Sequence, residues 1–353
     1  MSEAVNREIV LAARPEGGRV TPEMFALREA ARPAPGAGEV LVRNIYLSLD
    51  PAMRGWISET PNYRDPVALG EVMPGFTVGE VAESKHPDYQ PGELVTGRLG
   101  WRDWSLSDGS TIDRRVDPSI APITTALHVL GHTGFTAYLA LMEVGQPAPG
   151  ETVAVSTAAG AVGSMVGQIA KLKGCRTVGI TGSDDKVRAC SEQFGYDAAV
   201  NYKSHTPVGD LSAALGAACP EGIDVYFDNV GGEISDAVME HLNVRARIIV
   251  CGTMGIRDVA LDEPQPPGPR VNRTLLIKRA RMEGFLFFDQ VARMPEAIAD
   301  LAGWVRDGKL HYSEDIVDGL ENAPAALVRL LAGGNKGKMI VRVGLEPGQG
   351  ASS

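Results

Sequence analysis

With 353 residues, the chain is long enough for two domains, because single hydrophobic cores rarely grow beyond about 250–300 residues. Its hydrophobic content of 44% and charged content of 22% are typical of a globular protein, and its net charge of -10 disfavours nucleic acid or an anionic membrane as a main partner. No segment approaches the ~20 apolar residues that span a bilayer, and the start, MSEAVNREIV, has no apolar signal core, so we expect a cytoplasmic protein.

Short strand patterns separated by glycine and proline run through the first part of the chain. Examples are residues 39–45, 76–81 and 93–98. Short strands with such punctuation indicate a small β-rich domain, which we place at residues 1–130.

Strand and helix patterns alternate over residues 131–308. The predicted strands are 153–156, 176–181, 198–201, 223–228, 247–251 and 282–288. The predicted helices are 161–173, 184–194, 208–218, 232–242 and 291–307. Six strands with intervening helices predict an α/β domain of the Rossmann type, with a doubly wound parallel sheet.

The end of the chain carries a helix pattern near 323–332 and a strand pattern at 338–343. We predict that residues 309–344 rejoin the N-terminal domain, which makes that domain discontinuous, and that residues 345–353 form a flexible tail. The proline-rich segment 263–269 follows the fifth strand of the alternating region. Open parallel sheets bind ligands beyond their strand ends, so we expect this loop to cover a site.

A buried strand, a glycine turn and an amphipathic helix follow one another at residues 153–173. Within this segment Ala-Ala-Gly-Ala-Val-Gly, residues 158–163, matches the dinucleotide fingerprint with alanine in place of its first glycine. Gly160 lets the backbone approach a pyrophosphate, and Gly163 lets the helix pack close to the strand. The first N–H groups of the helix, at Ala161 and Val162, face an anion. The alternative is a tight turn without a ligand; the strand and helix on either side favour nucleotide binding.

The four cysteines are scattered through the second half of the chain. None forms a C-x-x-C pair, so the sequence suggests neither a structural zinc site nor a disulfide framework. We interpret them as buried thiols.

Six motifs in chain order resemble one family. They are YLSLDPAMRG (46–55), HPDYQPG (86–92), GFTAY (134–138), GQIAKLKGC (167–175), FDNVGG (227–232) and GNKGK (334–338). Together they resemble the zinc-free medium-chain dehydrogenases/reductases, in the branch with prostaglandin reductase, plant 2-alkenal double-bond reductases and bacterial curcumin reductase. The resemblance runs from about Arg7 to Val343 and implies a GroES-like, barrel-like catalytic domain beside the Rossmann domain, with the active site between them.

Zinc-dependent relatives carry a Gly-His-Glu motif and a cysteine cluster in the first domain. The comparable stretch here is Leu69-Gly70-Glu71-Val72, without histidine, and no cysteine precedes Cys175. We therefore expect no bound metal, which disfavours zinc-assisted alcohol dehydrogenase chemistry.

The end of the second Rossmann strand bears on the choice between NAD and NADP. Asp184 and Asp185 have the position of the carboxylate that binds the NAD ribose, but they fit equally as helix-capping residues. The resemblance matches Lys186 to a lysine that contacts the 2′-phosphate of NADP, with Gly182 and Ser183 leaving room for that phosphate. We expect NADPH as the cofactor; the alternative is that Lys186 is a solvated helix lysine.

The resemblance implies further cofactor contacts, each with a plain structural alternative. Tyr202 matches a tyrosine at the phosphate end, although a half-buried tyrosine after a strand would look the same. Asn229 matches an amide near the ribose or pyrophosphate, although by itself it is a turn residue. Backbone groups at the end of the fifth strand and in the sixth would hold the nicotinamide. Asn335 would reach the cofactor from the C-terminal segment. These backbone positions are Cys251, Gly252 and Thr253, and Phe285, Leu286 and Phe287.

Two departures from the branch affect the substrate side. Ala52 stands where the branch often has tyrosine after Asp-Pro, and Ile256-Arg257-Asp258 stands where it usually has Tyr-Asn. Tyr63 is the nearest remaining phenol. Arg257 is a cation that would lie near a developing enolate; the alternative is that it points to solvent. These two residues are our candidates for catalysis.

The sequence therefore predicts an NADPH-dependent reductase of carbon–carbon double bonds conjugated to a carbonyl, with a small α,β-unsaturated aldehyde or ketone as substrate. NADPH-dependent quinone reduction and catalytically silent NADPH binding remain alternatives. The resemblance also implies a homodimer.

Overall fold

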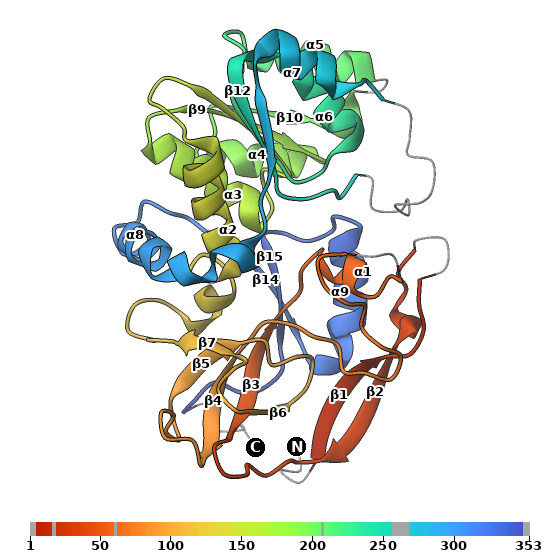
Figure 1. Cartoon of the computed structure of the whole chain (residues 1–353), viewed down its shortest axis with the longest axis vertical. Helices are drawn as coiled ribbons and strands as arrows, with labels where there is room; N and C mark the ends of the chain where they lie inside the picture. The colour runs from red at the N-terminus through yellow and green to blue at the C-terminus, as the bar shows by residue number, and fades with distance from the viewer. Residues whose placement is uncertain (1–4, 16–18, 60–61, 206–207, 256–267, 349–353) are drawn as a thin grey trace. The chain divides into compact units, whose positions relative to one another are not determined.

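The computed structural model describes residues 5–15, 19–59, 62–205, 208–255 and 268–348. Arg257 and most of the proline-rich segment 263–269 lie outside these ranges. The chain forms two compact units: Met1–Leu127 with Glu314–Ser353, and His128–Ser313. Each unit is described by itself below (Figure 1).

The second unit is built on a six-stranded parallel sheet. Its strands are β8 (Thr152–Ser156), β9 (Arg176–Thr181), β10 (Ala198–Asn201), β11 (Ile223–Asp228), β12 (Leu242–Val250) and β13 (Arg281–Gly284). Their order is β10-β9-β8-β11-β12-β13, so the strand order reverses at β8. The structure confirms the predicted doubly wound Rossmann sheet.

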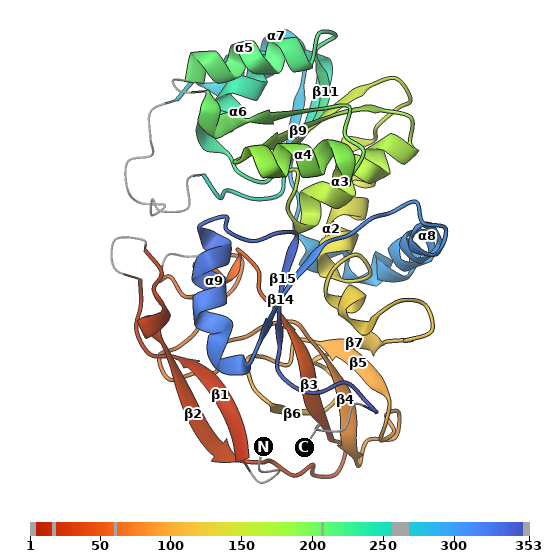
Figure 2. The same ribbon diagram turned by 180° about the vertical axis from the view of Figure 1, so that it is seen from behind.

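Helices cover both faces of this sheet. They are α2 (His132–Ala140), α3 (Ala161–Leu172), α4 (Asp184–Glu192), α5 (Val208–Ala218), α6 (Gly232–Met239) and α7 (Val271–Lys278), while α8 (Met294–Arg306) packs against α2. Figure 2 shows α5, α6 and α7 on one face and α2 and α3 on the other. All five residues of β8 are buried, which explains its run of Val, Ala and Thr without alternation.

The ends of two strands differ from the prediction. β13 ends at Gly284, so Phe285, Leu286 and Phe287 follow the sixth strand and do not lie in it. The Phe285 N–H still donates to Val250 O at 3.0 Å, but the chain then turns into a 3-10 helix at Phe287. β12 ends at Val250, so Cys251 also lies just beyond its strand.

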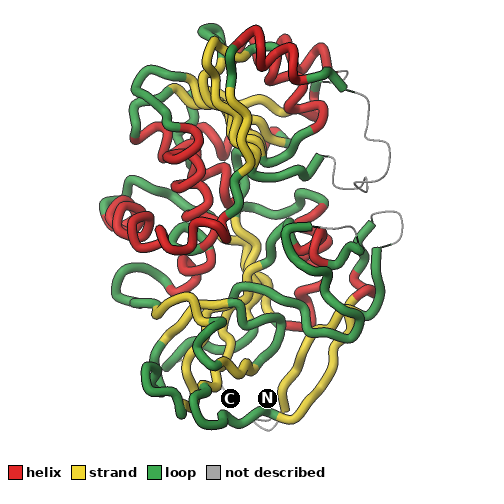
Figure 3. Tube along the Cα trace, viewed as in Figure 1, coloured by secondary structure: helices red, strands yellow, loops and turns green. Residues whose placement is uncertain are grey.

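The first unit is rich in strands and loops (Figure 3). Its strands are β1 (Val5–Leu11), β2 (Phe25–Ala31), β3 (Val40–Ser48), β4 (Thr77–Ser84), β5 (Leu94–Gly97), β6 (Trp104–Ser107), β7 (Ile112–Arg115), β14 (Glu314–Asp318) and β15 (Lys338–Arg342). The larger sheet has the order β14-β15-β3-β4-β5-β7, with β6 also paired to β3, and β1 pairs with β2. The C-terminal segment thus completes the N-terminal sheet, because β15 pairs antiparallel with β3. Two helices, α1 (Met53–Trp56) and α9 (Ala323–Leu331), contribute buried side chains to the core of this unit.

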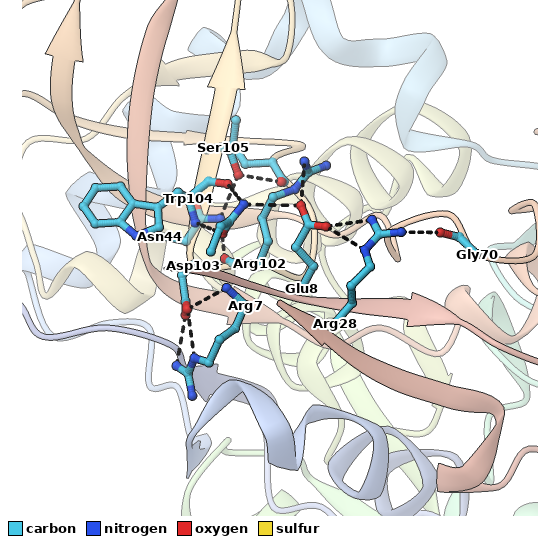
Figure 4. A network of polar contacts seen from close by, with 11 residues as sticks. Arg7, Glu8, Arg28, Asn44, Gly70, Arg102, Asp103, Trp104 and Ser105 are labelled. Atoms are coloured by element: carbon cyan, nitrogen blue, oxygen red, sulfur yellow. Dashed lines mark hydrogen bonds and ion pairs between the residues drawn. The ribbon is translucent and has the colours of Figure 1, made fainter. Parts of the chain in front are cut away.

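A network of charged side chains ties the β1–β2 hairpin to the rest of the first unit (Figure 4). Glu8 is buried and accepts from Arg28 at 2.7 Å, while Arg102 lies 3.7 Å from its other oxygen. Arg7 pairs with Asp103 at 2.9 Å. Because each charge has an opposite charge beside it, we interpret this network as structural and not as a reactive site.

No helix among the described residues is long and apolar enough to cross a membrane.

Candidate nucleotide-binding site

The turn between β8 and α3 forms a cradle made of backbone. The chain leaves β8 through Thr157, whose φ of 51° lies in the left-handed region, and enters α3 at Gly160. Gly160 is the N-cap residue and makes no side-chain cap hydrogen bond. The first N–H groups of a helix have no carbonyl of their own helix to bond, so those of Ala161, Val162 and Gly163 are available to an anion.

The two glycines of the cradle have different surroundings. A Cβ on Gly163 would lie 2.9 Å from the Ala158 Cα and closer still to the Thr157 carbonyl oxygen, so only glycine allows α3 to pack this near the turn. A Cβ on Gly160 would meet only Thr157, at 3.1 Å from its oxygen, and leaves the space in front of the helix open. This cradle fits the pyrophosphate of a dinucleotide, which needs close backbone approach at Gly160.

The carboxylates after β9 have protein partners. Ser183 is the N-cap of α4, and its hydroxyl accepts from the Lys186 N–H at 3.3 Å. Asp184 accepts from the side-chain amide of Asn201 at 2.7 Å, and Asp185 pairs with Arg188. Ser183 is the cap itself, and both aspartates lie in the first turn of α4 with protein partners, which favours the helix-end interpretation of the two carboxylates over the NAD-marker interpretation.

Three of the predicted cofactor residues, Ser183, Lys186 and Tyr202, lie near one another at the start of α4. A Cβ on Gly182 would stand 3.1 Å from the Tyr202 ring, which places Tyr202 next to Ser183 and hence near Lys186. Burial and the charge of Lys203 lower the pKa of the Lys186 ammonium. Sequence reasoning missed Lys203, although it directly follows Tyr202 in the chain.

Asn229 links the carboxyl ends of β8 and β11. Its side-chain amide donates to the Ser156 carbonyl at 2.8 Å, and its backbone N–H donates to the Ser156 hydroxyl at 2.8 Å. The preceding Asp228, which sequence reasoning also missed, accepts from the N–H groups of Val230 and Gly231 at 2.9 and 2.8 Å. Asp228 and Asn229 therefore hold the turn after β11 in place next to the cradle.

The segments after β12 and β13 are connected through backbone contacts. The Cys251 and Gly252 N–H groups donate to the Asp228 carbonyl at 2.8 and 3.1 Å. Burial raises the pKa of the Cys251 thiol to about 12, which keeps it protonated. Thr253 follows in the chain, and Phe287 stacks on Phe135 of α2, with ring centroids 6.3 Å apart.

Tyr63 and Asn335 belong to the first unit. The Tyr63 hydroxyl accepts from the Trp56 indole N–H at 2.8 Å, and burial raises its pKa. The Arg64 guanidinium lies 4.9 Å from the centroid of the Trp56 ring. Asn335 is buried and donates to the Gly337 carbonyl at 2.6 Å. Arg257, the other catalytic candidate, lies outside the described residues.

A buried ion pair in the first unit had no signal in the sequence. Lys338 is 2% exposed, and its ammonium donates to Asp50 at 2.5 Å and to the Leu49 carbonyl at 2.8 Å. The Ser48 hydroxyl donates to the second oxygen of Asp50 at 2.6 Å. The pair joins the start of β15 to the turn that carries α1.

Within the described ranges, no group of three or more His, Cys, Asp or Glu side chains is arranged to hold a metal ion.

Comparison with known proteins decides the family. Residues 7–114 match the family described as N-terminal domain of oxidoreductase, and residues 161–303 match the one described as zinc-binding dehydrogenase. The chain is 46% identical over 340 residues to an NADPH-dependent curcumin reductase of Escherichia coli, which covers 96% of this chain and 97% of that protein. The chain is a medium-chain dehydrogenase/reductase.

Two further relatives place this medium-chain dehydrogenase/reductase in its branch. A 2-alkenal reductase (NADP(+)-dependent) of Nicotiana tabacum is 41% identical, with 88% of this chain and 89% of that protein covered. The crystal structure of CurA in complex with NADPH from Vibrio vulnificus is 44% identical with a TM-score of 0.89, covering 96% of this chain and 100% of that chain. The resemblance inferred from six motifs is confirmed, and the medium-chain dehydrogenase/reductase belongs to the branch of curcumin, 2-alkenal and prostaglandin reductases.

Proposed function

We propose that the chain is an NADPH-dependent reductase of the carbon–carbon double bond in α,β-unsaturated aldehydes and ketones. The observation that carries this proposal is the intact backbone cradle at Gly160 and Gly163, in a chain 46% identical to a curcumin reductase over 96% of its length. The cradle is where such an enzyme binds its hydride donor.

The predicted cofactor residues would each bind a different part of NADPH. The first N–H groups of α3 would bind the pyrophosphate, and Ser183, Lys186 and Tyr202 would surround the 2′-phosphate. The backbone segments after β12 and β13, with Asn229 and Asn335, would contact the ribose and nicotinamide. When bound, NADPH supplies a hydride to the β-carbon of the substrate.

The chain's own residues would stabilise the charge that develops on the substrate oxygen. The Tyr63 phenol, which accepts from the Trp56 indole, would donate its O–H to the carbonyl oxygen of the substrate. Burial raises the pKa of Tyr63, which keeps the phenol protonated at neutral pH. Arg257 is the second candidate, as a cation beside the enolate. A proton then reaches the α-carbon, and the product is the saturated carbonyl compound.

Reduction of a 2-alkenal tests the proposal. NADPH oxidation with trans-2-hexenal is expected to yield hexanal, identified by mass spectrometry. Hexanal offered as substrate is the control, since an alkene reductase leaves it unchanged. Formation of an allylic alcohol, turnover of quinones alone, or NADPH binding without turnover of any of these acceptors would each contradict the proposal.

We also propose that the chain forms a homodimer through the edge of the Rossmann sheet. β13 is the last strand of that sheet, all four of its residues are exposed, and no described strand pairs with its outer edge. Leu276 and Ile277 of the neighbouring α7 are 78% and 53% exposed, and Met282 is 37% exposed. An open strand edge with exposed apolar side chains beside it favours pairing with a second copy. Light scattering after gel filtration should give twice the chain mass. The Met282→Lys variant should have the mass of a single chain.

The expected cytoplasmic location stays a prediction, which fractionation of the native cells would check.

A further inference from the structure

The turn after β10 brings a second lysine to the end of β9. This turn is the 3-10 helix Tyr202–Ser204, which lies beside Gly182. A Cβ on Gly182 would stand 3.4 Å from the Lys203 Cε, about as near as it would stand to the Tyr202 hydroxyl at 3.3 Å. The Lys203 ammonium is 6.0 Å from the centroid of the Tyr202 ring. The Lys203 side chain therefore runs alongside Tyr202 past the end of β9.

Asn201 fixes the backbone of Lys203 relative to α4. Its side-chain amide donates to Asp184 at 2.7 Å, in the first turn of α4. Its side-chain oxygen accepts from the Lys203 N–H at 3.1 Å. One side chain thus joins the β10 turn to the start of α4, the helix that carries Lys186.

The local carboxylates do not neutralise Lys203. Asp184 is occupied by Asn201, and Asp185 pairs with Arg188. In the described part of the chain, no carboxylate forms an ion pair with Lys203. Like charges held close together repel each other, and a ligand with two negative charges relieves that repulsion.

We propose that Lys203 is a second cationic ligand of the cofactor's 2′-phosphate, beside Lys186, and that it contributes to the preference for NADPH over NADH. The inference rests on the proposed function, because it takes the bound dinucleotide to be NADPH. The lower pKa of Lys186, caused by burial and by the Lys203 charge, agrees with two ammonium groups facing one site.

The experiment measures binding of 2′,5′-ADP and 5′-AMP by calorimetry, because the two ligands differ in the 2′-phosphate and turnover is not needed. Lys203→Met should weaken 2′,5′-ADP binding about tenfold, the value of one charge-assisted hydrogen bond, and leave 5′-AMP binding unchanged. Lys203→Arg should restore most of the affinity. Lys309→Met, an exposed lysine of the same unit, is the matched control and should bind both ligands like the unaltered protein.

Two results would overturn the inference in distinguishable ways. If the unaltered protein prefers 2′,5′-ADP, and Lys186→Met loses that preference while Lys203→Met keeps it, Lys203 is a solvated lysine and the proposed cofactor stands. If the unaltered protein binds 2′,5′-ADP no better than 5′-AMP, the inference and the choice of NADPH both fail. Raised salt provides a second readout, since loss of one cation should reduce the salt dependence of 2′,5′-ADP binding.

Discussion

Replacement of Gly163 by alanine tests whether the cradle depends on close packing of α3 against the β8 turn. The added Cβ would stand 2.9 Å from the Ala158 Cα and nearer still to the Thr157 carbonyl oxygen. Both neighbours are backbone atoms, so neither can rotate away, and the first turn of α3 must move outward. The same turn supplies the N–H groups proposed to bind the pyrophosphate.

The size of the effect follows from two opposing contributions. Overpacking against a rigid neighbour costs about 1–3 kcal/mol, while alanine in a helix gains about 0.5–1 kcal/mol over glycine. A net loss of about 1–2 kcal/mol in the free energy of unfolding is therefore expected. Displacement of the helix N-terminus should also break one hydrogen bond to the phosphate, which weakens NADPH binding about 10- to 100-fold.

Two other glycines of the same helix region separate stability from binding. Gly160→Ala meets only Thr157, at 3.1 Å, and its φ of −83° suits alanine, so stability should stay within ~0.5 kcal/mol while NADPH binding weakens. Gly167→Ala would clash with the Tyr196 ring, so stability should fall while NADPH affinity is kept. Urea unfolding and quenching of tryptophan fluorescence by NADPH measure the two quantities.

If Gly163→Ala had the stability to urea and the NADPH affinity of the unaltered protein, α3 would not need glycine at this residue. If Gly160→Ala bound NADPH with full affinity, close approach of the backbone to the pyrophosphate at that residue would be unnecessary.

Four further predictions concern the Lys338–Asp50 pair, the Trp56–Tyr63 contact and the cysteine thiols. Lys338→Met should lower the free energy of unfolding by about 3–5 kcal/mol, because it removes the cation beside the buried Asp50 carboxylate, and Asp50→Asn added to it should restore part of the loss; urea unfolding equal to that of the unaltered protein would contradict this. Trp56→Phe removes the indole donor to Tyr63 and should lower kcat with little change in the KM for NADPH, and it should have no further effect in a Tyr63→Phe background. Because burial raises the pKa of Tyr63 above its ordinary value near 10, kcat should not fall on the alkaline side until above that pH; a decline between pH 8 and 9 that Tyr63→Phe abolishes would contradict the assignment. Burial raises the pKa of all four thiols to about 11 or 12, so the folded protein should resist alkylation by its electrophilic substrates at pH ~7.5, whereas the urea-unfolded chain should gain four adducts by mass spectrometry; rapid modification of the folded protein, first at the partly exposed Cys251, would count against it.

Much of the Rossmann unit could be predicted from local patterns. β9, β10 and β11 begin and end at the residues predicted, 176–181, 198–201 and 223–228. These strands are short apolar runs between a helix pattern and a turn, and buried parallel strands produce that signal directly. The cradle at Gly160 and Gly163 could also be predicted from the sequence, because the need for glycine there arises from neighbours a few residues away in the chain.

The edge of the sheet could not be predicted in the same way. The run 282–288 is apolar enough to suggest a long strand, yet β13 stops at Gly284. Its residues are exposed, so burial does not determine its length; its pairing with β12 does, and this ends at Val250↔Gly284. Apolar composition alone does not distinguish a strand residue from one that follows a strand.

The sequence by itself determined the order of strands and helices, the glycine cradle and the family, since each depends on residue types at short spacing along the chain. Only the tertiary structure decided which polar side chains meet. Lys338 and Asp50 are 288 positions apart, and Lys203 approaches Gly182 because β9 and β10 are neighbours in the sheet. The interpretation of Asp184 as a first-turn residue of α4 with a protein partner likewise came from its contact with Asn201. The sequence around a lysine or aspartate does not identify its partner, because the partner depends on how distant strands pair and not on the residues on either side.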